Sequence, residues 1–247
     1  MFSFFEKKVY LADYLHGLVD IHNHILPGID DGAKTVEQSI ELLKGFGEFG
    51  VTNFICTPHI MHNYYDNTPK TIEQSYEKLK NKLVGENLLN VNIDCAAEHM
   101  IDDNFEDLLE KGEVMPLKKE YILIEMSYLQ PSLNFEMAVG KIAKNQLFPI
   151  LAHPERYMYL HPKYGKYEHM KSSGIQFQLN LLSLSPDSYG DATTKMAGKL
   201  IDDELINFVG TDIHNIRQLA VLKETRISKK LLKRLLPIIE HTIYTFY

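Results

Sequence analysis

Short apolar stretches alternate with amphipathic stretches along most of the chain, and this alternation limits the possible folds more than any other feature. Seven stretches have the length and apolar character of buried strands, and helix-like stretches separate most of them. The strands are predicted over residues 18–21, 53–57, 91–96, 121–125, 148–152, 175–179 and 206–210. Strand–helix alternation is typical of a parallel α/β fold. A chain of 247 residues, 45% of them hydrophobic, is large enough for one barrel-sized domain.

The helix-like stretches show the spacing expected for helices that pack on a sheet. The first places Val36, Ile40, Leu43 and Phe46 on one face, and Thr35 before it is a suitable N-cap. Further helices are predicted over residues 71–84, 104–110, 135–145, 193–203 and 229–244. Periodicity does not distinguish an open sheet from a closed barrel. The polar residues at the strand ends are the better evidence for choosing between these two folds.

Polar side chains that can bind metals follow six of the seven predicted strands. His22 and His24 lie two residues apart at the end of the first strand, where alternate side chains point to the same side. The possible ligands are His22, His24, Asp31, His59, Glu98, Glu125, His153, Asp212 and His214. Because a (β/α) barrel builds its active site at the carboxyl ends of its strands, this placement favours a barrel.

Each of these residues alone has an ordinary interpretation, such as a solvated strand end, a turn or a helix cap. Their joint placement favours a metal site, since histidine is the commonest metal ligand. Imidazole and carboxylate ligands without thiolate favour Mn, Fe or Zn, and nine ligands are too many for one ion. We therefore expect two or three ions that share a bridging carboxylate. Such a cluster holds a phosphate group and activates a water molecule for in-line attack.

Arg156 follows His153 by three residues, in the loop above the expected site. A guanidinium there could bind phosphate oxygens bidentately and stabilise transition-state charge, with an ordinary surface arginine as the alternative. Tyrosines in predicted loops on the same side could stack on an aromatic substrate, although loop packing is expected of any single one: Tyr64, Tyr65, Tyr128, Tyr157 and Tyr159. The remaining histidines are expected at the surface or in supporting roles: His16, His62, His99, His161, His169 and His241.

The formal net charge of −7 argues against a broad basic surface for nucleic acid. Cys56 and Cys95 are predicted to be free buried thiols of a reducing compartment. The chain has no apolar run of about 20 residues and no signal-peptide pattern, so a cytoplasmic protein is expected. Phe2, Phe4 and Phe5 are expected in an N-terminal flap packed on the body, with contact to a partner or membrane surface as the alternative.

Several motifs occur together between residues 18 and 217: Asp20-x-His22-x-His24, Asp30-Asp31-Gly32, Thr57-Pro58-His59, Glu98, Ile124-Glu125, Ala152-His153-Pro154-Glu155-Arg156 and Asp212-x-His214-Asn215. This set resembles the motifs of the polymerase and histidinol phosphatase (PHP) superfamily. Three longer stretches give a narrower match: residues 25–32, residues 121–125 and His153-Pro154-Glu155-Arg156. In these the chain resembles the bacterial metal-dependent protein-tyrosine phosphatases of capsular and exopolysaccharide operons.

The resemblance implies a distorted (β/α)7 TIM-like barrel, a single domain at residues 18–247, after an extension at residues 1–17 without an assigned role. It also implies a trinuclear centre, with manganese expected first and Fe or Zn as alternatives. One ion would take His22, His24, Glu98 and Asp212, a second Glu98, Glu125 and His153, and a third Asp31, His59 and His214. Arg156, Glu98 and Asp212 would be catalytic. Arg156 would contact the substrate phosphate, and Arg217 or Arg226 is a candidate for a second phosphate-binding arginine.

The implied reaction is hydrolysis of phosphotyrosine by a metal-activated hydroxide. A phosphocysteine intermediate is not expected, because neither Cys56 nor Cys95 begins a phosphate loop that ends in arginine. The implied partner is a bacterial tyrosine autokinase with a tyrosine-rich tail, which would allow peripheral association with the membrane; an oligomer is also possible. Three alternatives stay open: a phosphoesterase for a small phosphomonoester such as histidinol phosphate or for a phosphodiester, an amide-cleaving metallohydrolase, and a non-catalytic module that binds a phosphotyrosine tail.

Overall fold

Parallel strands form the centre of the molecule. The computed structural model of the chain describes residues 7–86 and 88–247. All seven predicted strands are present, and two short strands follow the second and third of them. The parallel strands are β2 (Val19–Asp20), β3 (Asn53–Cys56), β4 (His59–Ile60), β5 (Asn92–Cys95), β6 (Glu98–Met100), β7 (Tyr121–Glu125), β8 (Phe148–Ala152), β9 (Gln176–Asn180) and β10 (Phe208–Gly210).

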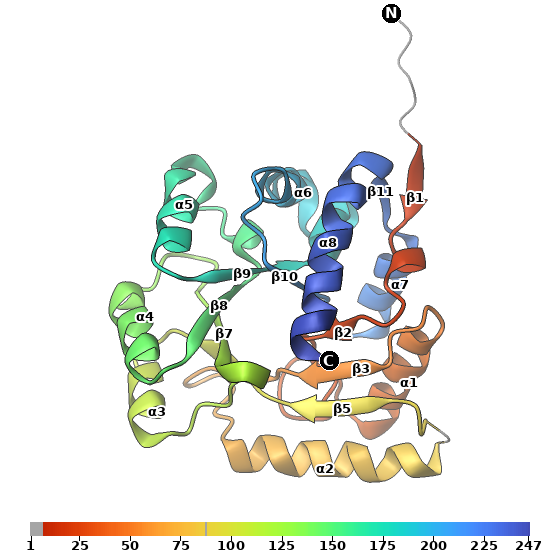
Figure 1. The fold of residues 1–247 in the computed structure, drawn as a ribbon. Helices are drawn as coiled ribbons and strands as arrows, with labels where there is room; N and C mark the ends of the chain where they lie inside the picture. Colours follow the sequence, from red (N-terminus) through yellow and green to blue (C-terminus); the bar gives the residue numbers. More distant parts are fainter. Residues whose placement is uncertain (1–6, 87) are drawn as a thin grey trace, which may run out of the picture.

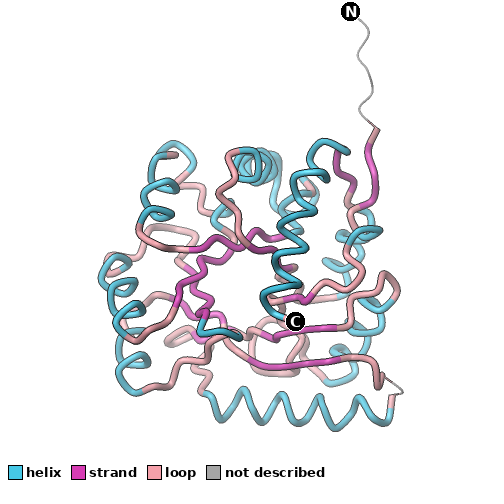
Figure 2. The backbone as a smooth tube through the Cα atoms, viewed as in Figure 1, coloured by secondary structure: helices cyan, strands magenta, loops and turns pink. Residues whose placement is uncertain are grey.

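The strands form two parallel sheets that follow one another around a common centre (Figure 2). One sheet has the order β10-β9-β8-β7-β6-β4 and the other the order β2-β3-β5. Thr57-Pro58 separates β3 from β4, where proline offers no backbone donor to a ladder. A parallel bridge between Asn23 and Ile213 connects the segments that follow β2 and β10. The result is a mixed α/β domain with a curled parallel sheet of the distorted TIM-like kind.

The described residues form eight α-helices. They pack outside the strands (Figure 1). They are α1 (Val36–Gly47), α2 (Pro69–Gly85), α3 (Phe105–Lys111), α4 (Phe135–Lys144), α5 (Gly165–Ser172), α6 (Pro186–Asp202), α7 (Ile216–Glu224) and α8 (Lys229–Phe246). Thr35 is the predicted N-cap of α1 and accepts a hydrogen bond from the Gln38 backbone. The six predicted helices are confirmed, but α6 begins earlier, at Pro186, and includes a break at Gly190, whose φ is +80°.

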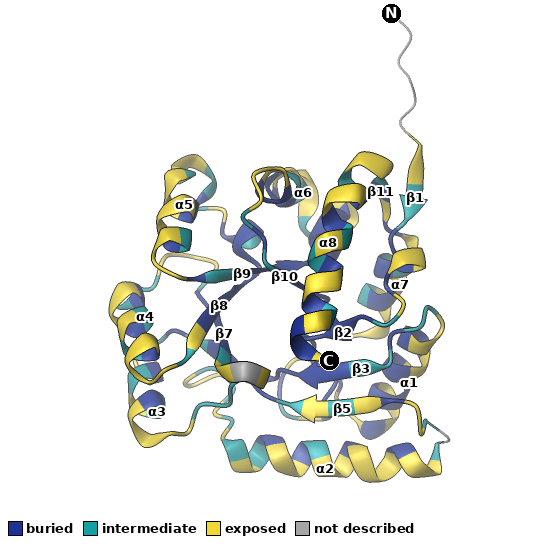
Figure 3. Cartoon of the chain, in the orientation of Figure 1, coloured by how far each residue is buried: buried dark blue, intermediate teal, exposed yellow. Residues whose placement is uncertain are grey.

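Two apolar clusters hold the domain together. The larger lies between the helices and the strands. The outward faces of the helices are exposed and most of the parallel strands are buried, with β5 partly exposed (Figure 3). The smaller gathers strand residues such as Ile21, Leu123 and Ile150 with Phe208 and Phe246. The ring of Phe246, at the end of α8, packs edge-on against Phe208 at 5.1 Å. Side chains therefore fill the strand interior, as in other barrel-like folds.

Residues after Lys7 lie against this body. Strand β1 (Lys8–Tyr10) pairs antiparallel with β11 (Arg226–Ser228), and Leu11 and Leu15 are fully buried. Phe2, Phe4 and Phe5 lie outside the described residues. No helix in the described part of the chain combines the length and the apolar character that a membrane crossing requires. Cys56 and Cys95 are both free, as predicted, although Cys95 is only partly buried.

Candidate metal centre

The nine predicted ligands lie together at the carboxyl ends of the parallel strands. They come from the segment after β2, the loop before α1, the starts of β4 and β6, the end of β7, and the segments after β8 and β10. All are buried except Asp31, which is exposed, and His214, which is partly buried. Buried charged side chains are rare unless they are paired or bind metals, so this concentration needs a chemical reason.

Glu98 occupies the middle of the group. One of its carboxylate oxygens, Oε2, lies 3.2 Å from His22 Nε2 and 3.1 Å from His59 Nδ1. The other oxygen, Oε1, lies 3.1 Å from His153 Nε2. The Glu125 carboxylate lies 2.9 Å from His59 Nδ1. A carboxylate with histidines on both oxygens is in the position of a bridging ligand between two ions.

Asp212 is the centre of a second group of contacts, with the two histidines His22 and His24. Its Oδ1 lies 3.4 Å from His22 Nε2 and 3.2 Å from His24 Nε2. Both Asp212 and His153 have left-handed backbone conformations, with φ of 54° and 36°. Such strain in residues other than glycine is uncommon and concentrates at functional sites.

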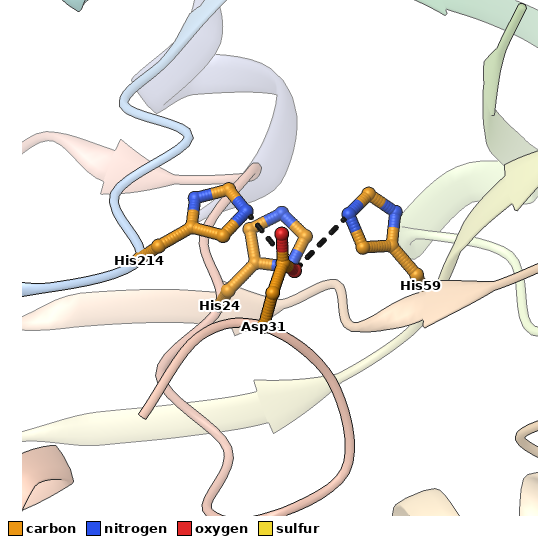
Figure 4. Close-up of side chains that lie close together, drawn as sticks. All are labelled: His24, Asp31, His59 and His214. Carbon is orange, nitrogen blue, oxygen red and sulfur yellow. Dashed lines mark ion pairs between the residues drawn. The ribbon is translucent and has the colours of Figure 1, made fainter. Parts of the chain in front are cut away.

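A third group surrounds Asp31, whose side chain lies among those of His24, His59 and His214 (Figure 4). Asp31 Oδ1 lies 3.5 Å from His59 Nε2 and 3.4 Å from His214 Nε2. The rings of His24 and His214 stack with centroids 3.9 Å apart. His59 therefore presents one ring nitrogen to the Asp31 group and the other to the Glu98 group.

Several buried ligand atoms have no hydrogen-bond partner among the described residues: His22 Nε2, His24 Nε2, His59 Nδ1, Glu98 Oε2 and Glu125 Oε1. Leaving buried polar atoms unsatisfied is costly and therefore rare. These atoms belong to four overlapping groups of His, Asp and Glu whose ligand atoms lie within 4.8 Å of one another. The donor set therefore fits divalent metal ions, which these atoms would coordinate.

The charges of the cluster compensate one another. Burial would raise the pKa of Glu98, but the neighbouring charges of His22 and His59 hold it well below its ordinary value. Burial lowers the pKa of His24, but the charge of Asp30 and the hydrogen bonds with Asp212 and Asp30 together outweigh burial and raise this pKa to about 10. Without ions, the raised pKa values of His22, His24 and His59 thus favour imidazolium groups whose charge the neighbouring carboxylates compensate.

A layer of polar side chains for which the sequence predicted no role orients the ligands. Gln178 Oε1 lies 2.7 Å from His22 Nδ1, and the Asn180 amide donates to Asp212 Oδ2 at 2.8 Å. Asp30 Oδ2 lies 2.8 Å from His24 Nδ1. Such partners fix the ring orientation of metal-binding histidines. A signal was available, because β9 alternates polar and apolar residues, with Gln176, Gln178 and Asn180 on one face, in the one predicted strand to which no ligand was assigned.

Arg156 lies beside the cluster, and its side chain is 17% exposed. Its Nη1 donates to Asp212 Oδ2 at 2.6 Å. The guanidinium lies between two aromatic rings, 4.5 Å from the centroid of Tyr128 and 4.1 Å from that of Tyr189. Tyr189 was not among the predicted site residues. Cation–π contacts of this kind restrict where a guanidinium can point.

The other predicted site residues occupy varied positions. Arg217 is exposed in the first turn of α7, and its side chain has no hydrogen bond or ion pair with the described residues. Tyr65 stacks on His59 at 5.3 Å, whereas Tyr64 is 79% exposed. The Tyr157 hydroxyl is buried and accepts a hydrogen bond from the Met126 backbone, which is a packing role.

The chain is similar to known proteins over most of its length. The profile of the family described as "Capsular polysaccharide synthesis, CpsB/CapC" matches residues 18–233. The protein CapC of Staphylococcus aureus is 32% identical over 206 residues, which cover 81% of this chain and 78% of CapC. Tyrosine-protein phosphatase YwqE of Bacillus subtilis is 28% identical over 201 residues, with 81% of this chain and 78% of YwqE covered.

A solved structure resembles the whole fold. It comes from the crystal structures of YwqE from Bacillus subtilis and CpsB from Streptococcus pneumoniae, described as metal-dependent tyrosine phosphatases. Its TM-score is 0.79 at 26% identity, and the match covers 93% of this chain and 96% of that chain. The lactonase Lmo2620 of Listeria monocytogenes reaches a TM-score of 0.53 at 12% identity, which is a likeness of fold alone.

Proposed function

The chain belongs to the CpsB/CapC family of capsular polysaccharide synthesis, and we propose that it is a metal-dependent protein-tyrosine phosphatase that hydrolyses phosphotyrosine. The observation that carries the proposal is the buried cluster of histidines and carboxylates around Glu98, with Arg156 beside it. Imidazole and carboxylate ligands together with a guanidinium suit a phosphate ester better than an amide.

We assign the ligands to three ions, with manganese as the first expectation. One site uses His22, His24, Glu98 and Asp212, a second Glu98, Glu125 and His153, and a third Asp31, His59 and His214. The contacts of Glu98 with histidines on both oxygens support its bridging role. The two ring nitrogens of His59 point to different groups, and the contact of Nε2 with Asp31 supports the use of Nε2 in the third site.

The chain's own residues supply binding and orientation. When bound, divalent ions in this cluster would lower the pKa of a water molecule and draw charge from the phosphate oxygens. Arg156 would donate two parallel hydrogen bonds to the phosphate, held in place by Tyr128, Tyr189 and Asp212. Arg217 follows His214 by three residues and has an exposed side chain without a hydrogen bond or ion pair among the described residues, and we propose it as the second phosphate-binding arginine.

The proposed architecture is a (β/α)7 barrel at residues 18–247. It counts β3 with β4 as one strand and β5 with β6 as another, because each pair is separated by only two residues. The bridge between Asn23 and Ile213 supports closure between the first and last strands. Residues 1–17 are proposed as a separate extension, of which residues 8–10 add an edge strand beside β11.

The proposed substrate is a phosphorylated tyrosine on a protein partner. We propose a bacterial tyrosine autokinase that controls capsule or exopolysaccharide synthesis, which is the process named for the family. We propose that the protein is cytoplasmic and associates with the membrane only by binding this kinase.

The deciding experiment is phosphate release from a phosphotyrosine peptide by metal-stripped protein across a Mn²⁺ titration. Rapid release that depends on Mn²⁺ is expected. A parallel panel contains histidinol phosphate and a phosphodiester. Faster turnover of either compound, or no release from the peptide by folded protein at any Mn²⁺ concentration, would overturn the assignment.

A further inference from the structure

A cavity of about 540 Å³ lies between α4 and α5, which are neighbours outside β8 in Figure 1. Its floor is apolar and includes Met126, Phe135, Leu160 and Met170. No proposed metal ligand lines it. The volume falls within the usual range of pockets that enclose a ligand.

A row of tyrosine rings connects this cavity to the proposed phosphate site. Tyr159 lines the cavity, and its ring centroid lies 5.8 Å from that of Tyr157. The ring centroid of Tyr157 lies 5.9 Å from that of Tyr128. The Arg156 guanidinium lies over the Tyr128 ring, 4.5 Å from its centroid. The cavity and the proposed phosphate site are therefore on opposite sides of one aromatic wall.

The rim of the cavity is basic. Lys163, Lys166 and His169 line it together with one acidic side chain, Glu136. Neither lysine amine has an ion-pair or hydrogen-bond partner among the described residues, and both side chains are exposed. In a chain with a net charge of −7, this local positive charge favours an acidic partner.

The segments that form the wall and the rim also expose apolar side chains. The exposed ones are Tyr128 (41%), Leu129 (91%), Leu133 (102%), Met137 (55%) and Met158 (51%). A small ligand would need only the cavity, whereas an apolar surface that extends beyond it indicates a protein partner. The unpaired lysines and the proximity to Arg156 indicate that this partner is the substrate itself.

We propose that the cavity between α4 and α5, with Lys163 and Lys166 at its rim, is a docking subsite for the substrate polypeptide. An apolar side chain of the substrate fills the cavity, and acidic residues near the phosphotyrosine pair with the two lysines. The inference rests on the proposed phosphatase function, because it assigns the surface to that enzyme's substrate.

The test compares free phosphotyrosine with a phosphotyrosine peptide that carries glutamate and leucine residues on both sides. The double variant Lys163→Glu/Lys166→Glu should raise KM for the peptide about tenfold and leave kcat/KM for free phosphotyrosine within about twofold. A peptide with lysines in place of the glutamates should recover the lost affinity. Added salt should raise KM for the acidic peptide more in the wild type than in the double variant.

Two further variants sharpen the test. Ser173→Trp places a large ring at the exposed mouth of the cavity and should raise KM for the peptide alone. Lys229→Glu/Lys230→Glu changes the net charge equally on α8, away from the cavity, and should match the wild type.

The outcomes separate the two hypotheses. The docking subsite alone would be overturned if the wild type hydrolyses the peptide and the cavity variants have the same kinetics as the wild type. It would also be overturned if the cavity variants are equally impaired on both substrates. A wild type with Mn²⁺ that hydrolyses neither substrate would overturn the phosphatase function and the subsite with it.

Discussion

Arg156 is held by an arrangement that favours one orientation of its guanidinium. The rings of Tyr128 and Tyr189 lie on it, and Asp212 accepts a hydrogen bond from Nη1. Contact with the carboxylate of a proposed metal ligand places its positive charge beside the ions and the phosphate they would hold. A transition state gains more from such a fixed donor than from a mobile one.

Arg156→Ala should therefore lower kcat/KM for a phosphotyrosine peptide by about 10²–10³-fold while the metal content stays normal. Arg156→Lys should recover only a small part, because an ammonium lacks the planar pair of donors. Arg217→Ala should raise KM with little change in kcat. Steady-state kinetics and elemental analysis of the same preparations provide the measurement. Unchanged kinetics in Arg156→Ala would remove that residue from the mechanism.

Glu98→Gln should lose metal and activity together, because a neutral amide is a poor bridge between two cations. The buried histidines would also lose the carboxylate that compensates their charge, so circular dichroism should first establish that the variant is folded. Glu113→Gln, an exposed site, provides the matched control. Full metal occupancy in folded Glu98→Gln would refute the bridging assignment.

Among the secondary-structure elements, the end of β10 depends on a close approach that only glycine permits. A Cβ atom at Gly210 would lie 2.6 Å from the Cβ of His22 and 3.0 Å from Gln178 Nε2. Gly210→Ala should therefore destabilise the metal-stripped protein by about 1–3 kcal/mol in urea unfolding and displace His22.

The control for this variant is Gly198→Ala in α6, where an added Cβ meets no atom within 4 Å. It should be neutral or stabilise by about 0.5–1 kcal/mol, because alanine is the better helix former. Equal stability of Gly210→Ala and the wild type would show that the approach of β10 to His22 imposes no steric limit.

The strand–helix alternation predicted the elements well because each buried strand has its own local apolar signal. It missed two helices, α5 and α7. Each buries only two side chains, Tyr167 and Met170 in α5 and Leu219 and Leu222 in α7, so the apolar period is weak. It also missed the pairing of β1 with β11, because a partner more than 200 residues away leaves no local period. The ligands at strand ends were predictable for the same reason as the strands, whereas Asn180 and Tyr189 act through contacts that only folding creates.

At the scale of the whole molecule, the smaller apolar cluster and the polar cluster lie toward opposite ends of the same strands. Phe246 of α8 and Phe208 close one end with apolar packing. The other end concentrates buried imidazole and carboxylate groups that apolar packing cannot satisfy.

Metal binding should therefore stabilise the folded chain as well as activate it. With free Mn²⁺ at about 100 times its Kd, linkage adds about 2.7 kcal/mol, or roughly 5–10 °C in Tm.

The same linkage predicts that metal binding releases protons. Burial lowers the pKa of His24, but Asp30 and Asp212 together raise it to about 10, so we expect the ring to keep its proton at neutral pH when no ion is bound. An ion needs the neutral ring, and lowering the pH therefore favours the metal-free protein while raising it favours the metal-bound form. Titration calorimetry with Mn²⁺ in two buffers of different ionisation enthalpy measures the protons released. Equal heats in both buffers would show that the histidines are already neutral, and that imidazolium–carboxylate pairing does not hold the metal-free site together.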